Sequence, residues 1–294
     1  MEIPKVQNET FLRLEDMART RDVVQNFFKD NERRYANNTV RQYTVALRQF
    51  FAYCKIEYDS VTTKDIRAWL AALDTAGQKM KTLCVKLITI KSFYRYCLEE
   101  ELINESPASN VRLPKLADTE LHYLERRTLA RLMELTKNKP VERAMLATLY
   151  ATGVRITELL NIRIGDINWE TRQIVIRKGK GNKDRFVLFT AECAERLKDY
   201  LATFETPYLF ARSEGKPWSA GWARSKFRGY TRELNSAHPI TPHTMRHTFA
   251  AHLAEKNMPL EYIQELLGHV RLNTTQGYIK LSAHSNKKQY DDYQ

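Results

Sequence analysis

The sequence predicts a mainly α-helical protein with one small β-hairpin, built as two domains. This fold class rests on three features of the chain. Apolar residues recur at helical spacing through most of residues 23–103. A proline-containing stretch without periodicity follows. Beyond that stretch, helical segments surround two short runs rich in β-branched and aromatic residues. With 294 residues, the chain can form two domains that each bury a core.

The first domain is predicted to be a small helical bundle. Asn37, Asn38 and Thr39 form a cap-like helix start, and Thr62 and Thr63 are N-cap candidates for the next helix. Each segment carries an apolar stripe and a polar face, which is typical of a bundle in water. The four expected helices lie near residues 23–35, 37–54, 61–74 and 80–103.

The domain boundary is predicted from residues 104–119, which contain Pro107 and Pro114 and lose all apolar periodicity. We therefore expect a helical domain over residues 18–104, a linker over 105–119 and a second domain over 120–294.

The second domain is predicted to be mixed. Residues 172–178 and 184–190 read as short strands around the turn-rich segment GKGNK, so a β-hairpin is expected there. One helix is expected to end at Gly153, and another starts near Ile156. The remaining helices are expected near residues 125–137, 190–203, 219–235, 243–256, 259–267 and 273–280, followed by a polar tail after Leu281.

Composition narrows the class of protein. Lys and Arg number 47 against 35 Asp and Glu, so the net charge is +12, which fits a polyanionic partner or simply a basic soluble protein. The four cysteines form no CxxC pair, which gives no support for a metal site and fits a reducing compartment. No apolar run approaches the ~18 residues of a membrane span, and the start lacks a signal-peptide apolar region. We expect a soluble cytoplasmic protein without a membrane partner.

Four local patterns could carry chemistry. His243 and Arg246 lie three residues apart on one helix face, where they can address one anion or simply form a solvated face. Arg155 follows Gly153 at a helix start suited to phosphate. The hairpin tip presents Lys178, Lys180 and Lys183, which could reach a DNA backbone or form a solvated turn. His269 follows a helix end, and Tyr278 lies in a short helix, where an ordinary core tyrosine is the competing interpretation.

Taken in order, these residues resemble the active site of the tyrosine recombinase (phage integrase) family, most nearly its Xer-like two-domain members. The segments TGVRITELLNIRIGDIN, GKGNKDR, HTMRHTFAAHLAE and LLGHVRLNTTQGYI carry the resemblance, which covers roughly residues 20–281. Val270, Gly277 and Lys280 depart from the common pattern. The implied fold is a helical core-binding domain followed by an α+β catalytic domain. The implied catalytic set is Arg155, Lys180, His243, Arg246, His269 and Tyr278.

The resemblance implies a site-specific recombinase that needs neither metal nor ATP nor any other cofactor. Tyr278 attacks the scissile phosphate and forms a 3′-phosphotyrosine bond. Arg155 and Arg246 bind the charge of the transition state, and Lys180 protonates the leaving 5′ oxygen. His243 accepts the tyrosine proton or hydrogen-bonds the phosphate, and His269 hydrogen-bonds a non-bridging oxygen.

The expected partner is double-stranded DNA at recombination sites, with a homotetramer on two synapsed sites and a monomer when free. DNA contacts are expected mostly at phosphates, so affinity should fall with salt. Solvated surface is an equally good interpretation of each candidate contact. The candidates are Thr39, Arg41, Gln42, Lys79, Lys81, Thr82 and Lys86, with Lys178 and Lys183 at the hairpin.

Three alternatives remain from the sequence. A type IB topoisomerase uses a very similar set of residues for nicking and closing DNA. A non-catalytic DNA-binding regulator would need no nucleophile, although all six catalytic positions are filled. A basic scaffold protein would explain the net charge, but the presence of all six candidate catalytic residues in the family's order would then be a coincidence.

Overall fold

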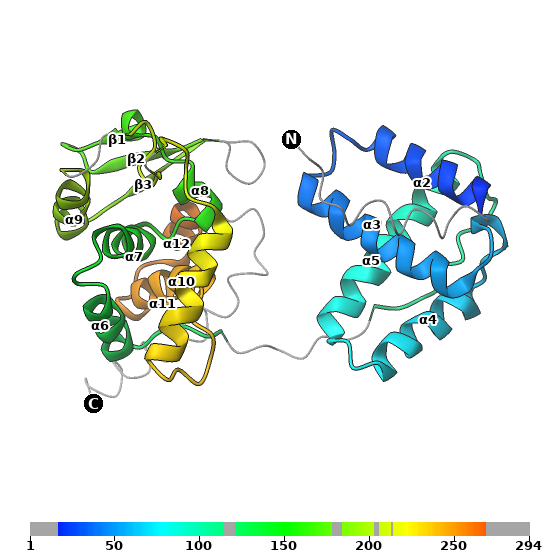
Figure 1. Cartoon of the computed structure of the whole chain (residues 1–294). Coiled ribbons are helices and arrows are strands. Elements are labelled where there is room, and N and C mark those ends of the chain that lie inside the picture. Colours follow the sequence, from blue (N-terminus) through cyan, green and yellow to red (C-terminus); the bar gives the residue numbers. More distant parts are fainter. Residues whose placement is uncertain (1–16, 114–120, 178–183, 203–205, 213, 269–294) are drawn as a thin grey trace. The chain divides into compact units, whose positions relative to one another are not determined.

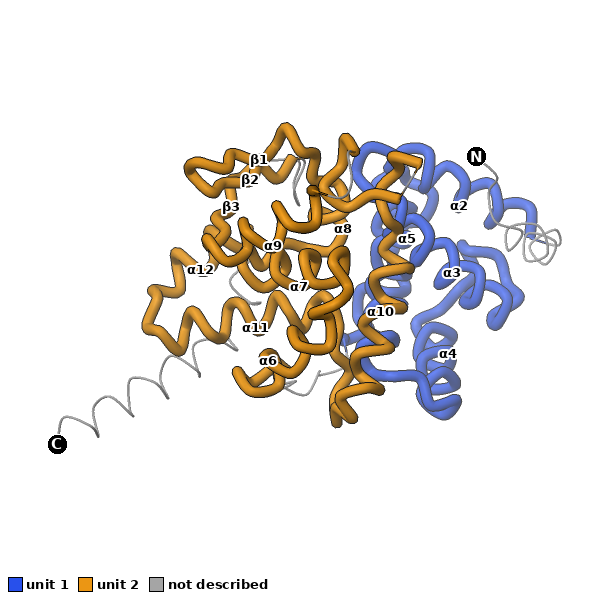
Figure 2. Tube along the Cα trace, turned by 60° about the vertical axis from the view of Figure 1, so that its left-hand side comes forward, with its two compact units in different colours: residues 1–119 blue, residues 120–294 orange. Residues whose placement is uncertain are grey.

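The computed structural model describes residues 17–113, 121–177, 184–202, 206–212 and 214–268. The chain separates into two compact units between Thr119 and Glu120 (Figures 1 and 2). The described part is mostly helical with one small antiparallel sheet, as predicted. None of the helices described is long and apolar enough to cross a membrane.

The first unit is a bundle of helices around an aromatic core. Its elements are α2 (Ala18–Asp30), α3 (Asn37–Cys54), η3 (Tyr58–Ser60), α4 (Thr63–Thr75) and α5 (Met80–Glu99). The long helix α5 contacts α2, α3 and α4. Phe93 meets both Phe27 and Phe51 edge-to-face, and Trp69 of α4 packs edge-to-face on Phe50. Aromatic pairs of this kind add about 0.5–1.5 kcal/mol beyond the area that they bury.

Two details of the first unit differ from the sequence expectation. The cap of α3 is Ala36, without a side-chain hydrogen bond, and Asn37–Thr39 form the first helical turn. By contrast, Thr62 does cap α4, in a reciprocal capping box with Asp65. The second difference concerns the predicted linker, residues 105–119, whose first part packs on this unit. Ala108 and Val111 are buried in its core, and the Pro107 carbonyl accepts a hydrogen bond from Thr63.

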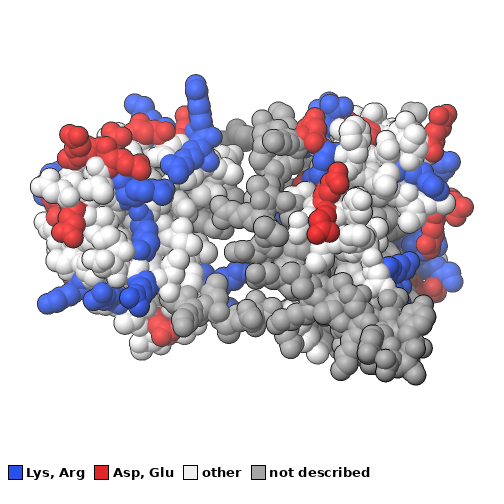
Figure 3. Space-filling view, turned by 180° about the vertical axis from the view of Figure 1, so that it is seen from behind, with Lys and Arg blue, Asp and Glu red and all other residues white. Residues whose placement is uncertain are grey.

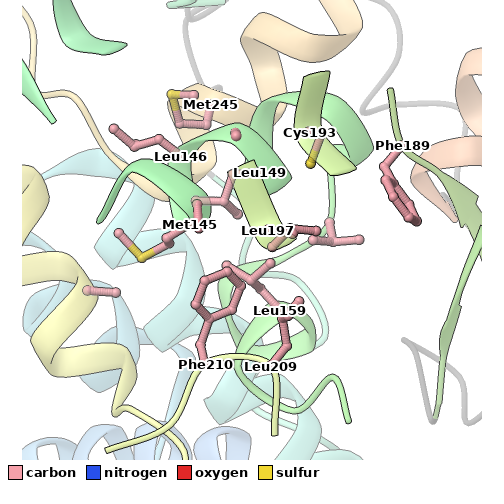
Figure 4. Packing of buried hydrophobic residues seen from close by; sticks show 14 of the residues in the cluster. Met145, Leu146, Leu149, Leu159, Phe189, Cys193, Leu197, Leu209, Phe210 and Met245 are labelled. Atoms are coloured by element: carbon pink, nitrogen blue, oxygen red, sulfur yellow. The ribbon is translucent and has the colours of Figure 1, made fainter. Parts of the chain in front are cut away.

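In the second unit, other helices and the sheet pack around a buried central helix, α7. Helix α7 contacts α6, α8, α9, α11 and strand β3. Figure 4 shows the core that results, with Met145 and Leu149 of α7 packed among Leu159, Leu197 and Phe210. The helices are α6 (Arg126–Leu135), α7 (Pro140–Thr152), α8 (Ile156–Leu160), η4 (Ile164–Asp166), α9 (Ala191–Leu201), α10 (Ala220–Glu233), α11 (Pro242–Glu255) and α12 (Leu260–Leu267).

The predicted hairpin is present and has one strand more than expected. Strands β1 (Ile167–Asn168), β2 (Gln173–Ile176) and β3 (Arg185–Leu188) pair antiparallel in that order. Ile174 pairs with Val187, and both face the core. The last described pair is Ile176 with Arg185, so the ladder brings the two ends of the lysine-bearing segment together. Residues 178–183 themselves lie outside the described residues.

The turn between α7 and α8 is a tight corner that requires glycine. Gly153 caps α7 with φ +61°, a left-handed conformation that favours glycine. A Cβ at this position would lie 2.4 Å from the Phe249 ring and 2.9 Å from Leu267. The corner is therefore pressed against α11 and α12, and this contact places the next residues, Val154 and Arg155, beside α11.

Candidate active site

Arg246 of α11 lies at the centre of the site and is fixed by main-chain atoms. Its guanidinium donates to the Gly153 carbonyl at 2.7 Å and to the Leu267 carbonyl at 2.6 Å. The residue is only 3% exposed. Because each carbonyl ends a helix, Arg246 binds the C-terminal ends of α7 and α12, where the helix dipole favours a cation. Its orientation is therefore set by the packing of three helices.

Arg155 is the N-cap residue of α8 and is fixed by a carboxylate. Its guanidinium donates to Glu158 at 2.7 Å, and its backbone N–H donates to the same side chain at 2.8 Å. Glu158 also receives two hydrogen bonds from Arg185, at 3.0 and 2.8 Å. Burial opposes ionisation of Glu158, yet the bonds from Arg185 and Arg155 outweigh it and hold the pKa at about 2. Glu158 is therefore a carboxylate at neutral pH.

His243 sits in the first turn of α11, one turn before Arg246. Thr241 caps this helix by accepting the N–H of Thr244 at 3.0 Å, and Pro242 occupies the first position. The His243 ring meets His247 edge-on at 5.2 Å between centroids. Burial, then the neighbouring His243 and Arg246, lower the pKa of His247 to about 4. His247 is thus neutral at physiological pH and adds no charge beside Arg246.

A cleft of about 990 Å³ connects these elements. Arg155 and His243 both line it, and the exposed face of α10 forms another wall. Three arginines on that face, Arg224, Arg228 and Arg232, repeat every four residues and are exposed. Sequence reasoning did not single them out, although the spacing is visible in residues 219–235. The cleft is therefore rich in guanidinium groups, which suit phosphate oxygens.

The helix α10 that carries this arginine row is tied to the core by a buried carboxylate. Glu142 of α7 is 7% exposed and accepts from the Tyr230 hydroxyl at 2.5 Å. The ammonium of Lys226 lies 2.7 Å from its other oxygen. Burial opposes ionisation of Glu142, but the hydrogen bonds from Lys226 and Tyr230 outweigh it and lower the pKa. This pair of contacts keeps the wall of the cleft in place.

The predicted site residues are thus only partly described by the structure. Arg155 and His243 share the cleft, and Arg246 binds the carbonyl two residues before Arg155. Lys178, Lys180, Lys183, His269 and Tyr278 lie outside the described residues. Among the described residues, no group of three or more His, Cys, Asp or Glu could hold a metal ion.

The candidate DNA contacts of the first unit divide into two groups. Residues 41, 42, 79, 81 and 82 are exposed, and Thr39 is half-buried. Lys86 differs, since it is 7% exposed, lies 5.7 Å from the Trp69 ring centre and donates to Gln49 at 2.6 Å. Its position one turn from Leu83 and Ile90 on an apolar stripe could have indicated this burial. Figure 3 shows basic side chains in an irregular band across one face of this unit.

The chain is similar to known proteins over most of its length. Residues 122–285 match the phage integrase family model, and residues 24–101 match its N-terminal SAM-like domain. Tyrosine recombinase XerA of Pyrococcus furiosus is 34% identical over 84% of this chain and 85% of its own length. Tyrosine recombinase XerC of Bacillus subtilis is 30% identical over 88% of this chain and 91% of its own length.

Solved structures show the same fold. XerH recombinase bound to palindromic difH, at 19% identity, has a TM-score of 0.73 and covers 97% of this chain and 88% of XerH. A crystal structure of XerA recombinase, at 25% identity, has a TM-score of 0.53 and covers 93% of this chain and 98% of XerA. The relatives are recombinases, so neither a topoisomerase nor a non-catalytic regulator is favoured. The chain therefore belongs to the phage integrase family of tyrosine recombinases and is a site-specific recombinase, an enzyme that transfers DNA strands.

Proposed function

We propose that this recombinase cleaves DNA by transesterification, with Tyr278 as the nucleophile. The phenolic oxygen of Tyr278 attacks the scissile phosphorus and forms a 3′-phosphotyrosine bond, while the bond from phosphorus to the 5′ oxygen breaks. Bond energy is retained in the phosphotyrosine, so a 5′-hydroxyl can reverse the reaction without ATP. The observation that carries this proposal is the buried Arg246, which is fixed at the Gly153 corner within two residues of Arg155.

Arg155 and Arg246 are proposed to bind the non-bridging oxygens of the phosphate. Negative charge concentrates on these oxygens in the transition state, and planar guanidinium groups can donate to them in pairs. Both arginines are held before any substrate is present, by carbonyls in one case and by Glu158 in the other. Prior orientation of this kind lowers the reorganisation needed at the moment of reaction. Arginines can thus take the place of a metal in this site.

The other roles follow from the family resemblance. His243, at the start of α11 and on the cleft, accepts the tyrosine proton or hydrogen-bonds the phosphate. His269 hydrogen-bonds a non-bridging oxygen, and Lys180 gives a proton to the leaving 5′ oxygen. The last two assignments, like that of Tyr278, rest on the sequence motifs.

DNA is proposed to bind mainly through phosphate contacts, along the exposed arginines of α10 and the exposed candidates of the first unit. Neutralising each phosphate releases counterions, so affinity should fall steeply with salt. We also propose that cleavage of two sites takes place in a homotetramer, that the free protein is a monomer and that it acts at the nucleoid. Solved relatives bound to their DNA sites support the DNA contact, which XerH shows with difH. Sedimentation with and without duplex measures the change in assembly.

The proposed chemistry is tested with a nicked duplex from the native locus. Cleavage beside the nick releases a short strand, so the covalent intermediate accumulates and survives denaturation on a gel. We expect a covalent protein–DNA band for the wild type and none for Tyr278→Phe, with equal salt-sensitive binding by both. The absence of a band from the wild type, despite tight binding, would overturn the proposed chemistry.

A further inference from the structure

Arg185, the first residue of β3, makes contacts that its place in a hairpin does not require. Its guanidinium donates to both carboxylate oxygens of Glu158, at 3.0 and 2.8 Å. Glu158 in turn accepts from the side chain and the backbone of Arg155. The Arg185 and Glu158 side chains are 15% and 8% exposed. One buried carboxylate therefore joins the start of β3 to an arginine of the cleft.

Arg185 also lies across the end of α12. A Cβ at Gly268 would be 3.0 Å from both Cδ and Nε of Arg185, and Gly268 has φ +62°. Glycine is thus required here by the backbone conformation and by the side chain above it. The chain passes from this residue directly to His269. Arg185 of β3 consequently contacts two other elements, α8 and the end of α12.

A second arginine at the same hairpin provides a natural comparison. Arg177 follows β2 and donates to Asp166 at 2.7 Å, with exposed fractions of 62% and 4% for the two side chains. This pair resembles that of Arg185 and Glu158 in being an arginine on a buried carboxylate. Asp166 receives its other bond from the backbone of Arg163, at 3.1 Å, and none from Arg155. Arg177 therefore anchors the hairpin without a described contact to Arg155 or Gly268.

We propose that Arg185 is a positioning residue for DNA strand cleavage, which orients Arg155 through Glu158 and fixes β3 against the end of α12. It contacts no reacting atom. The inference rests on the proposed function, in which Arg155 binds the scissile phosphate. Small displacements matter for such a group, because misplacement by about 1 Å can lower a rate about 10²-fold.

Among the described residues, loss of Arg185 leaves the buried Glu158 carboxylate with Arg155 as its one remaining cationic partner. Burial raises the pKa of Glu158, and the bonds from Arg185 and Arg155 are what keep it at about 2. Without Arg185 the pKa rises, so mild acid protonates part of Glu158 and weakens its hold on Arg155. The cleavage defect should therefore grow as the pH is lowered. Simple loosening of the hairpin base would not produce this dependence.

The test compares the full-length wild type with Arg185→Gln, Arg185→Lys and the matched control Arg177→Gln. Single-turnover adduct formation on the nicked duplex is measured over a range of DNA concentrations and pH. We expect Arg185→Gln to lower the maximal rate about 10²-fold with unchanged half-saturating DNA. Arg185→Lys should recover part of the rate, since an ammonium keeps the charge but not the paired donors. Arg177→Gln should stay close to the wild type.

Arg185 could affect cleavage through Glu158 and Arg155, or through Lys180, the proposed proton donor that lies five residues before it in the sequence. A duplex with a bridging sulfur separates these two routes. Replacing the bridging 5′ oxygen with sulfur makes a leaving group that needs no proton. The Lys180→Ala defect should therefore disappear on this DNA, while the Arg185→Gln defect should persist because Arg155 is still displaced. Disappearance of both defects would overturn the route through Glu158 and Arg155.

The outcomes distinguish this inference from the proposed function. No adduct from the wild type would overturn both. A wild-type adduct with equal rates for Arg185→Gln and Arg177→Gln, or a defect seen only in DNA affinity, would overturn the positioning role alone. Thermal unfolding of each variant shows whether it is folded. If Arg185→Gln does not fold, a wild-type rate from a folded Arg185→Lys would overturn the requirement for paired donors.

Discussion

Arg246 and Arg155 are both proposed to bind the scissile phosphate, but they are held in different ways. Arg246 is buried and donates to two main-chain carbonyls, at the ends of α7 and α12. Arg155 is a quarter exposed, with 24% of its side chain accessible, and donates to the Glu158 carboxylate. These two carbonyls belong to the main chain, so no side-chain substitution at Gly153 or Leu267 deletes them. The orientation of Arg155, by contrast, depends on one carboxylate and on the second arginine that shares it.

The difference shows that the same chemical group can be preorganised by the fold or by a side-chain network. Substitution near Arg246 should therefore affect stability and cleavage together, because its partners are the helix ends themselves. Substitution in the network around Arg155 should lower the rate, and its effect on stability should depend on pH. Substitutions at four positions should separate these two modes.

Arg246→Lys should have the largest effect. An ammonium cannot reach both carbonyls and the substrate in the geometry of a guanidinium, so one buried carbonyl loses its partner at a cost of about 1–3 kcal/mol. Removing a charge-stabilising donor typically lowers a rate about 10²–10³-fold. Single-turnover cleavage and urea unfolding measure the two losses. A variant with normal stability and rate would show that the carbonyl contacts are unimportant.

Glu158→Gln should lower the cleavage rate up to about 10²-fold with little change in DNA affinity. It should also alter the response to acid. The pKa of Glu158 falls from 4.5 to about 2 in the folded chain, so the carboxylate stabilises the fold above about pH 4.5. That contribution fades as the pH falls from 4.5 towards 2 and should be missing from the variant. Urea unfolding at several pH values measures this contribution to the free energy of unfolding. The same pH dependence of stability in the wild type and in Glu158→Gln would show that Glu158 does not supply it.

Gly153→Ala tests the corner on which Arg246 depends. The new methyl group would lie 2.4 Å from the Phe249 ring in a left-handed backbone conformation. Overpacking of this kind costs about 1–3 kcal/mol, so the unfolding midpoint should fall. Gly77→Ala is a useful control, because Gly77 also has a positive φ (+74°) but no atom lies within 4 Å of its Cβ position. Equal losses in both variants would show that backbone strain alone is responsible.

Arg228→Ala should have the smallest effect on cleavage. Arg228 is exposed on the wall of the cleft and makes none of the network contacts of Arg155. We expect a uniformly weaker affinity and a salt slope smaller by about 1, with the maximal cleavage rate unchanged. Titration of a fluorescent duplex at several salt concentrations gives the slope. A large loss of maximal rate would assign Arg228 to the reaction itself.

The elements of the fold could be predicted because each carries a local pattern. Helical spacing located the helices, and the strand-like runs around 178–183 located β2 and β3. Gly153 was expected as a helix end, and it is one. Strand β1 has only two residues, too short for an alternating pattern, and forms because Ile167 finds Ile174 as its partner. Its existence depends on tertiary structure.

The network around Arg155 could not be predicted in the same way. Glu158 occupies the third position of α8, where a carboxylate that accepts the N-cap N–H is a recognisable local signal. Its second partner, Arg185, is 27 residues away and meets it only because the sheet folds onto α8. For Lys86 a local signal was present but was not used. Its charge suggested a DNA contact, whereas its apolar neighbours one turn away indicated the burial that the structure shows.

The central claim, that Tyr278 becomes covalently attached to DNA, has one direct measurement. The adduct formed on the nicked duplex is digested with nuclease and trypsin, and the peptides are analysed by mass spectrometry. Trypsin releases residues 272–280, a peptide whose single tyrosine is Tyr278. We expect this peptide to carry a nucleotide phosphate in the wild type, and we expect no adduct with Tyr278→Phe. A phosphodiester on any other residue, or a Tyr278→Phe adduct, would contradict it.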